Sequence, residues 1–128
     1  MLTALLIAIA AAPVSHARNV LSVRAARSDI ASLLAVTRST AIMSGGAELV
    51  VDIAGGAAWI EQGAGVRFGE VQNIADRHGV RLDAGSALLN IRYDPLGIGR
   101  ISNTVLRVKR GSVTATLTIS AYGRVRES

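Results

Sequence analysis

The first third of the chain constrains the fold most, because it has the pattern of one long helix with two unlike halves. Residues 1–14 are uncharged and nearly all apolar. Residues 18–43 contain neither glycine nor proline, and at about 100° per residue their apolar side chains fall on one stripe. The stripe consists of Val23, Ala26, Ile30, Leu33, Leu34, Thr37 and Ala41, and Arg24, Arg27 and Arg38 lie along its flank. We expect an apolar helix that bends at Pro13, continues as an amphipathic helix and ends at Gly45-Gly46.

Three interpretations of the apolar segment are open. As a helix, residues 1–14 would span about 21 Å, which is less than the ~30 Å hydrocarbon core of a bilayer. The segment has the length of the apolar part of a signal peptide, but no basic residue precedes it. A buried core helix would need an equally apolar partner. We favour the third interpretation, a membrane helix whose first turns lie upstream of Met1.

Beyond Gly46 the apolar residues recur with a period of two, which is typical of strands. Strands are predicted at residues 47–53, 57–61, 80–83, 87–93, 104–110 and 112–120. The last one alternates throughout, with Val113, Ala115, Leu117 and Ile119 inward and Thr114, Thr116, Thr118 and Ser120 outward. Residues 62–79 have mixed polarity and several glycines, and we expect a long loop with one helical turn there. A long helix followed by antiparallel strands indicates the α+β class.

The basic residues are concentrated in the last third of the chain. The formal net charge is +5. From Arg92 onward, seven basic side chains face only Asp94 and Glu127 as acidic ones, whereas the earlier charges balance. This asymmetry indicates a polyanionic partner or an acidic protein surface, and a solvated basic sheet face is an equally good interpretation. The chain has no cysteine, so disulfides and thiolate metal sites are excluded.

No catalytic constellation stands out in the sequence. Asp76 and His78 occur close together in the predicted loop, but a Ser-His-Asp site can be assembled from almost any sequence. The carboxylates and the histidine between Glu70 and Asp83 match no metal-binding spacing. We therefore expect no enzymatic activity, no cofactor, no metal and no small-molecule substrate.

Four segments of the chain stand out together. Residues 5–13 are an apolar run that ends in proline, and residues 28–46 are a leucine-rich helical segment that ends at a glycine before the first strand. The segment Ile-Arg-Tyr-Asp-Pro-Leu-Gly at residues 91–97 contains an aromatic-x-Pro-x-Gly turn, with the motif residues Tyr93, Pro95 and Gly97, and the chain ends with Gly-Arg-Val-Arg at residues 123–126. In this order the four segments resemble the signal helix, the leucine-rich helix, the turn and the C-terminal signature of the GspH/FimT family of minor pilins and pseudopilins.

The resemblance implies a pilin-like, non-enzymatic subunit. Residues 1–17 would be an apolar anchor that crosses the bacterial inner membrane once, and residues 18–128 a periplasmic head. Its partners would be the other minor and major pseudopilins of a type II secretion system. The alternative is a FimT-like minor type IV pilin that binds DNA during natural transformation. That function would use Arg124 and Arg126, together with Arg107, Lys109 and Arg110.

The chain departs from the family pattern at its start. The family has a short basic leader ending in glycine, then an apolar stretch with a glutamate near its beginning, and neither is present here. We expect the genomic sequence upstream of Met1 to encode both in frame.

Overall fold

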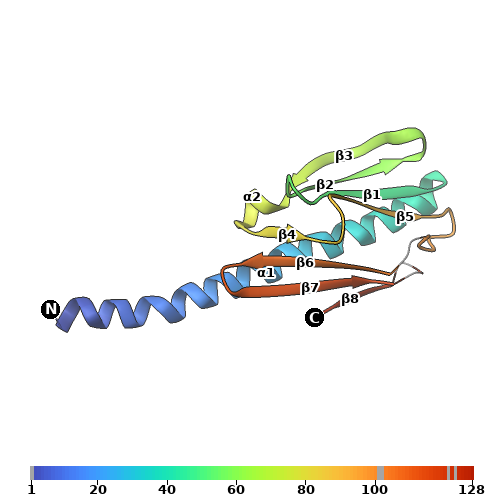
Figure 1. The fold of residues 1–128 in the computed structure, drawn as a ribbon. Coiled ribbons are helices and arrows are strands. Elements are labelled where there is room, and N and C mark those ends of the chain that lie inside the picture. Colours follow the sequence, from blue (N-terminus) through green and yellow to red (C-terminus); the bar gives the residue numbers. More distant parts are fainter. Residues whose placement is uncertain (1, 101–102, 121, 123) are drawn as a thin grey trace.

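A single helix organises the whole structure. The computed structural model describes the backbone of residues 2–100, 103–120, 122 and 124–128, and the side chains of all of these except residues 2–13 and Ala64. Helix α1 (Leu2–Ser44) runs without interruption through Pro13. Its first half projects beyond the rest of the chain, and its second half packs against β-strands that form a head (Figure 1).

The second half of α1 buries the stripe expected from the sequence. Val23, Ala26, Ile30, Leu34, Thr37 and Ala41 are at most 1% exposed, and Leu33 is half-buried. The helix ends where Gly45 and Gly46 adopt positive φ, and the amides of both donate to the carbonyl of Ala41. A residue with a side chain would be strained there, so the glycine pair sets the end of the helix.

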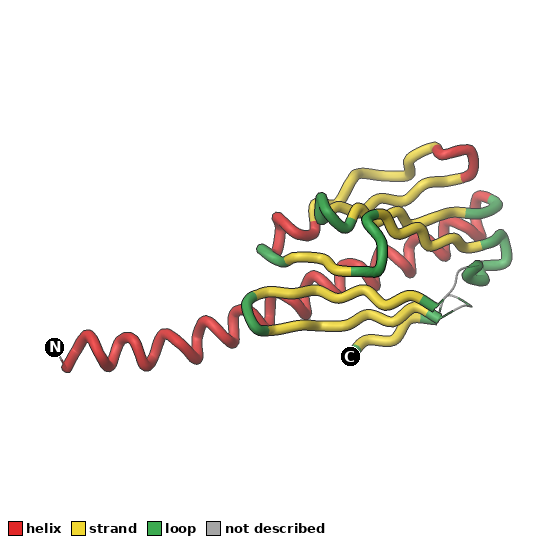
Figure 2. Tube along the Cα trace, viewed as in Figure 1, coloured by secondary structure: helices red, strands yellow, loops and turns green. Residues whose placement is uncertain are grey.

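The predicted α+β class is confirmed, and the antiparallel strands divide into two sheets (Figure 2). The first sheet has the order β3-β2-β1-β5 and the second the order β4-β6-β7-β8. In the first sheet the strands are β1 (Ala47–Asp52), β2 (Ala57–Gln62), β3 (Val66–Asn73) and β5 (Leu88–Tyr93). In the second they are β4 (Arg81–Asp83), β6 (Thr104–Arg110), β7 (Val113–Ile119) and β8 (Val125–Glu127).

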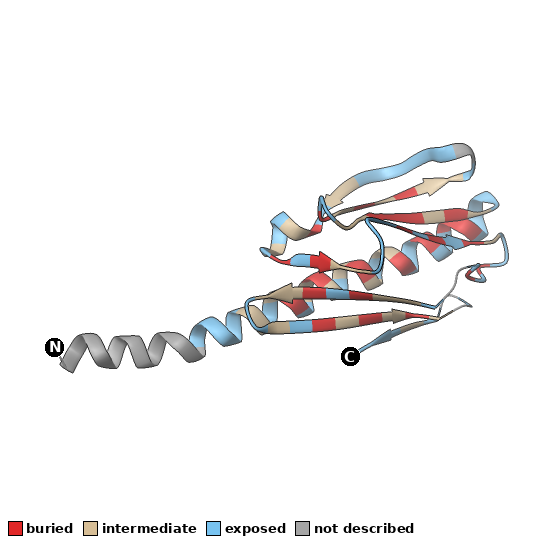
Figure 3. Cartoon of the chain, viewed as in Figure 1, coloured by how far each residue is buried: buried red, intermediate tan, exposed pale blue. Residues whose placement is uncertain are grey.

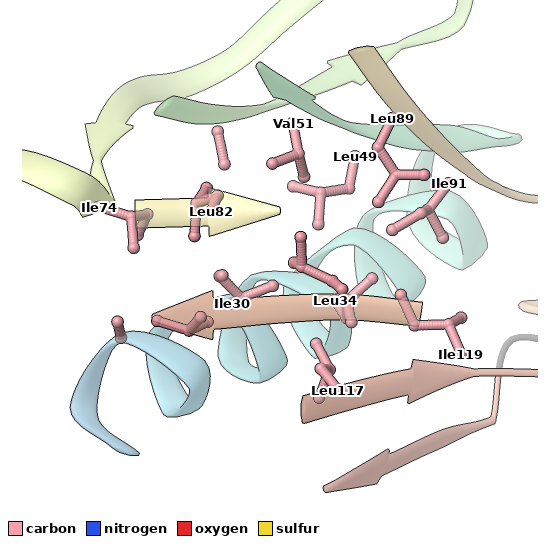
Figure 4. Packing of buried hydrophobic residues seen from close by; sticks show 14 of the residues in the cluster. Ile30, Leu34, Leu49, Val51, Ile74, Leu82, Leu89, Ile91, Leu117 and Ile119 are labelled. Carbon is pink, nitrogen blue, oxygen red and sulfur yellow. The ribbon is translucent and has the colours of Figure 1, made fainter. Parts of the chain in front are cut away.

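The chain passes between the sheets three times, which joins them into one unit. After β3 it forms the short helix α2 (Ile74–His78), enters the second sheet at β4, returns to the first at β5 and then completes the second. Both sheets turn apolar faces toward α1, and the three elements share one core (Figure 4). Ile30 and Leu34 of α1 lie in that core with side chains from both sheets, among them Leu49, Ile91 and Leu117.

The prediction of a long loop at residues 62–79 is wrong, because strand β3 lies within it. Only the 3-10 turn η1 (Gly63–Gly65) and α2 lie outside strands within residues 63–78, and α2 is the one helical turn that was expected. Five of the eight residues of β3, from Val66 to Glu70, are exposed in succession, because β3 is an edge strand beyond the part of the sheet that α1 covers (Figure 3). Without a buried face, no alternation marks the strand in the sequence.

Within the described part of the chain, no helix is both long enough and apolar enough to span a membrane.

Candidate functional site

Three of the five predicted DNA-contact residues share one surface. In antiparallel sheets, directly paired residues project on the same face. The pairs Arg107–Thr116, Lys109–Thr114 and Thr118–Arg126 therefore place Arg107, Lys109 and Arg126 on the face of the second sheet that points away from α1. Pairing of β4 with β6 adds Arg81, opposite Lys109, and Asp83, opposite Arg107. We name this surface the basic face; it consists of Arg81, Arg107, Lys109 and Arg126, with Asp83 and the threonines Thr114, Thr116 and Thr118.

One ion pair crosses the basic face. The Lys109 Nζ lies 3.0 Å from Asp83 Oδ2. The hydrogen bond from Lys109, followed by the charge of the same lysine, lowers the pKa of Asp83 below its ordinary value. Asp83 is thus ionised at neutral pH and offsets one of the four cations. Arg107 and Arg126 are exposed, so the face retains a net positive charge toward solvent.

Arg110 lies on the opposite side of β6 from Arg107 and Lys109. Its Nη1 donates to Ser22 Oγ at 2.7 Å and to the carbonyl of His78 at 2.9 Å. Those contacts tie the end of β6 to α1 and α2. The structure therefore gives Arg110 a stabilising role within the head and does not bring it to the basic face.

Arg124 is also separate from the basic face, although it precedes Arg126 by only two residues. Arg124 lines a groove between α1 and the C-terminal segment, and Arg38 of α1 lines the same groove. Strand β8 begins only at Val125, so Arg124 lies outside the strand that carries Arg126. Arg81 and Arg38 were not among the predicted site residues, because only the strand pairing and the helix packing bring them to these surfaces.

The predicted turn motif packs against the end of α1. Asp94 Oδ1 accepts hydrogen bonds from the amides of Leu96 and Ile98, which closes the turn after β5. Gly97 has a φ of 79°, and a Cβ there would lie 2.8 Å from Ile42 Cδ1. Tyr93 is 2% exposed, and burial raises the pKa of its hydroxyl while the nearby charge of Arg38 partly opposes that change. Pro95 is exposed. The motif thus positions the turn on the helix.

The histidine of the predicted loop serves as a contact between helices. His78 Nε2 lies 2.6 Å from Asp29 Oδ2 of α1, and Arg77 Nη1 lies 3.2 Å from the same oxygen. Burial raises the pKa of Asp29, but the hydrogen bonds from His78 and Arg77 outweigh it and the net shift is downward. His78 therefore pairs with Asp29 rather than with Asp76, and Asp76 is exposed. Among the described residues, no group of three potential metal ligands occurs.

Comparison with known proteins identifies the fold. No protein-family model matches the sequence, and a search of curated proteins finds no match. Two crystal structures of the type IV minor pilin FimU from Pseudomonas aeruginosa strain PAO1 are similar, each with 14% sequence identity. The first has a TM-score of 0.67 over 83% of this chain and 87% of that chain, and the second a TM-score of 0.64 over 82% and 91%. In agreement with its resemblance to the GspH/FimT family, the chain has the type IV pilin fold, a long N-terminal helix packed on an antiparallel β-sheet head.

Proposed function

We propose that the chain is a minor pseudopilin, a non-enzymatic structural subunit of the pseudopilus of a type II secretion system. In this proposal α1 anchors the subunit in the inner membrane before assembly, and the head lies in the periplasm. During assembly the projecting half of α1 leaves the lipid and packs against the same helices of neighbouring minor and major pseudopilins.

The observation that supports this role is the projecting half of α1. The backbone of its first turns extends past the sheets of the head (Figure 1). Val14 is 59% exposed and Leu21 is 68% exposed, and a separation of seven residues places them on one face of the helix. Residues 2–13, which precede them, carry no charge. A helix that is apolar all round is stable in lipid or among other helices, and a filament core provides the latter.

Cross-linking at the projecting helix tests the proposal. Because the chain contains no cysteine, Leu21→Cys introduces a single reactive thiol on the uncovered face. In the native host, we expect this variant to cross-link to other subunits of the same filament. Thr114→Cys, on the basic face of the head, is the matched control and should give fewer such products. Equal, low cross-linking at both positions would contradict the proposal.

Loss of secretion distinguishes a pseudopilus from a pilus. Deletion of the chain should reduce export of folded proteins through the outer membrane, and DNA uptake should continue. The opposite result, loss of transformation with normal export, would identify the second candidate function.

The second candidate is a minor pilin that binds DNA, and the basic face favours it. This face carries four cations and one carboxylate, and its threonines supply hydroxyl donors. Arginine, lysine and threonine side chains on an open surface suit phosphate contacts that do not depend on base sequence. None of the aromatic residues lies on these strands, so base stacking would not contribute.

A mobility-shift titration tests DNA binding. The protein should bind duplex DNA with micromolar or weaker affinity, and binding should fade between about 50 and 200 mM salt because phosphate contacts release counterions. Arg107→Ala combined with Arg126→Ala should reduce the salt slope by about two units, roughly one for each phosphate contact. Arg92→Ala, an exposed arginine on the first sheet, is the control. Absence of a shift at low salt would exclude this function.

A further inference from the structure

A groove with two arginines separates α1 from the C-terminal segment. It consists of two adjoining hollows of about 590 and 350 Å³. The larger hollow is lined by Ala31, Leu34, Ala35, Arg38, Ser39, Ile42, Tyr93, Arg124 and Val125. Arg38 and Arg124 line the smaller one as well, so the two hollows share both arginines.

The two cations of the groove have no acidic partner in the described structure. No acidic residue occurs among the described lining residues of either hollow, and none of the ion pairs within the described part involves Arg38 or Arg124. The nearby carboxylate of Asp94 is committed to Arg100 and to two backbone amides. Both arginines are exposed, so their donors are available to a ligand from outside.

Apart from Ser39, the residues that line the larger hollow beside the two arginines are apolar or aromatic. Ala31 and Ala35 are one helical turn apart, and their short side chains leave space for a ligand beside this face of α1. Ile42 is 55% exposed, and Tyr93 and Val125 also line this hollow. A ligand that fills the groove would therefore place apolar atoms on either side of its anionic group.

Among the described strands, none pairs with the outer backbone edge of the adjacent strand β8. β8 is the last strand of the second sheet. Residues 124 and 128 bond to β7 through their backbones, so the alternation of an antiparallel ladder directs the backbone groups of Val125 and Glu127 to the free side. An extended segment of another chain can pair with such an edge.

We propose that this groove binds an extended segment of another protein chain, through a carboxylate that Arg38 and Arg124 hold between apolar side chains. The charge of the site requires an anion, and two guanidinium groups suit a carboxylate because each can donate two parallel hydrogen bonds. The apolar walls and the free edge of β8 favour a peptide over a nucleic acid, whose phosphates bind best to an open basic surface such as the basic face. This inference goes beyond the proposed filament role and does not depend on it.

Two matched peptides test the proposal without altering the protein. The probes are acetyl-Ala-Val-Glu-Val-Ala-amide and its glutamine counterpart, titrated into the full-length, isotope-labelled protein in non-ionic detergent. Amide shifts should change at Ala31, Ala35, Ile42 and Val125, and the glutamate peptide should bind about tenfold more tightly, as expected for two partly solvated ion pairs. Equal binding of both peptides, or shifts confined to the basic face, would overturn the proposal.

Paired variants then assign the effect to the groove. Arg38→Gln and Arg124→Gln should each remove most of the preference for the glutamate peptide, whereas Arg126→Gln, two residues along the chain, should keep it. A full preference in the first two variants would overturn the proposal. Short duplex DNA is the third probe: shifts at the groove with DNA and none with the peptides would also overturn it, and would assign the site to nucleic acid.

Discussion

The two faces of the second sheet differ in composition and in function: the inward face stabilises the fold, and we expect the outward face to bind a partner. The inward face packs Leu106, Val108, Leu117 and Ile119 against α1, and all four are 0% exposed. The outward face alternates with it, residue by residue, and carries the cations and threonines of the basic face. Because the two sets share the same strands, substitution of neighbouring residues separates stability from binding.

The largest loss of stability is expected from a substitution on the inward face. Leu117→Asp would bury a carboxylate with no partner, which costs several kcal/mol and is comparable with the ~5–15 kcal/mol stability of a small domain. We expect the variant to lose the cooperative unfolding transition in a thermal melt followed by circular dichroism.

Thr116→Asp, one residue away on the outward face, is the control. Its side chain is half-buried beside Arg107, so the new carboxylate gains a nearby cation, and the melting temperature should change little. Similar melts for the two variants would show that the faces are assigned incorrectly.

An intermediate loss of stability is expected when one of two arginines of β6 is replaced: Arg110, but not Arg107. Arg110→Ala removes the hydrogen bonds to Ser22 and His78, and leaving their oxygens without these partners should cost about 1–3 kcal/mol in the free energy of unfolding. Arg107→Ala removes an exposed side chain and should cost no more than about 0.5 kcal/mol. Urea unfolding of both variants measures the difference. If the two variants were equally stable, Arg110 would have no role in holding β6 to the helices.

The contrast between a buried and a solvated face also explains which elements the sequence could predict. The buried stripe of α1 and the bounds of β6 were confirmed, because one face of each element is buried and the other is solvated, and the apolar period records that directly. β3 was missed because it is an exposed edge strand. The division into two sheets was missed for another reason, since it depends on pairings between distant strands, β1 with β5 and β4 with β6.

The candidate surfaces were predictable to a similar extent. The basic last third indicated an anionic partner, and strand alternation was enough to place Arg107 and Lys109 on one face. Contacts across the fold decided the rest: β4 brings Arg81 to the basic face, and packing against α1 separates Arg124 and Arg110 from it. Those contacts link segments far apart in sequence, so no local pattern records them.

The smallest effect on stability is expected for the ion pair on the outward face. The hydrogen bond from Lys109 lowers the pKa of Asp83 in the folded state. A carboxyl group with a lowered folded pKa contributes stability above its unfolded pKa and loses that contribution as the pH falls through the folded value. Asp83→Asn should therefore be slightly less stable than the parent at about pH 7 and equally stable at about pH 2.

The same substitution acts in the opposite direction on binding. Asp83 is the one acidic residue that the described strand pairings place on the basic face, so Asp83→Asn leaves its four cations unopposed. If this face contacts DNA, the variant should bind duplex DNA more tightly than the parent at low salt, and the gain should shrink as salt screens the charges. Urea unfolding at two pH values and a mobility-shift titration at two salt concentrations measure both effects on the same protein. A variant that lost stability strongly at neutral pH would show that Asp83 supports the fold, and the division between a stabilising inner face and a binding outer face would then fail at this position.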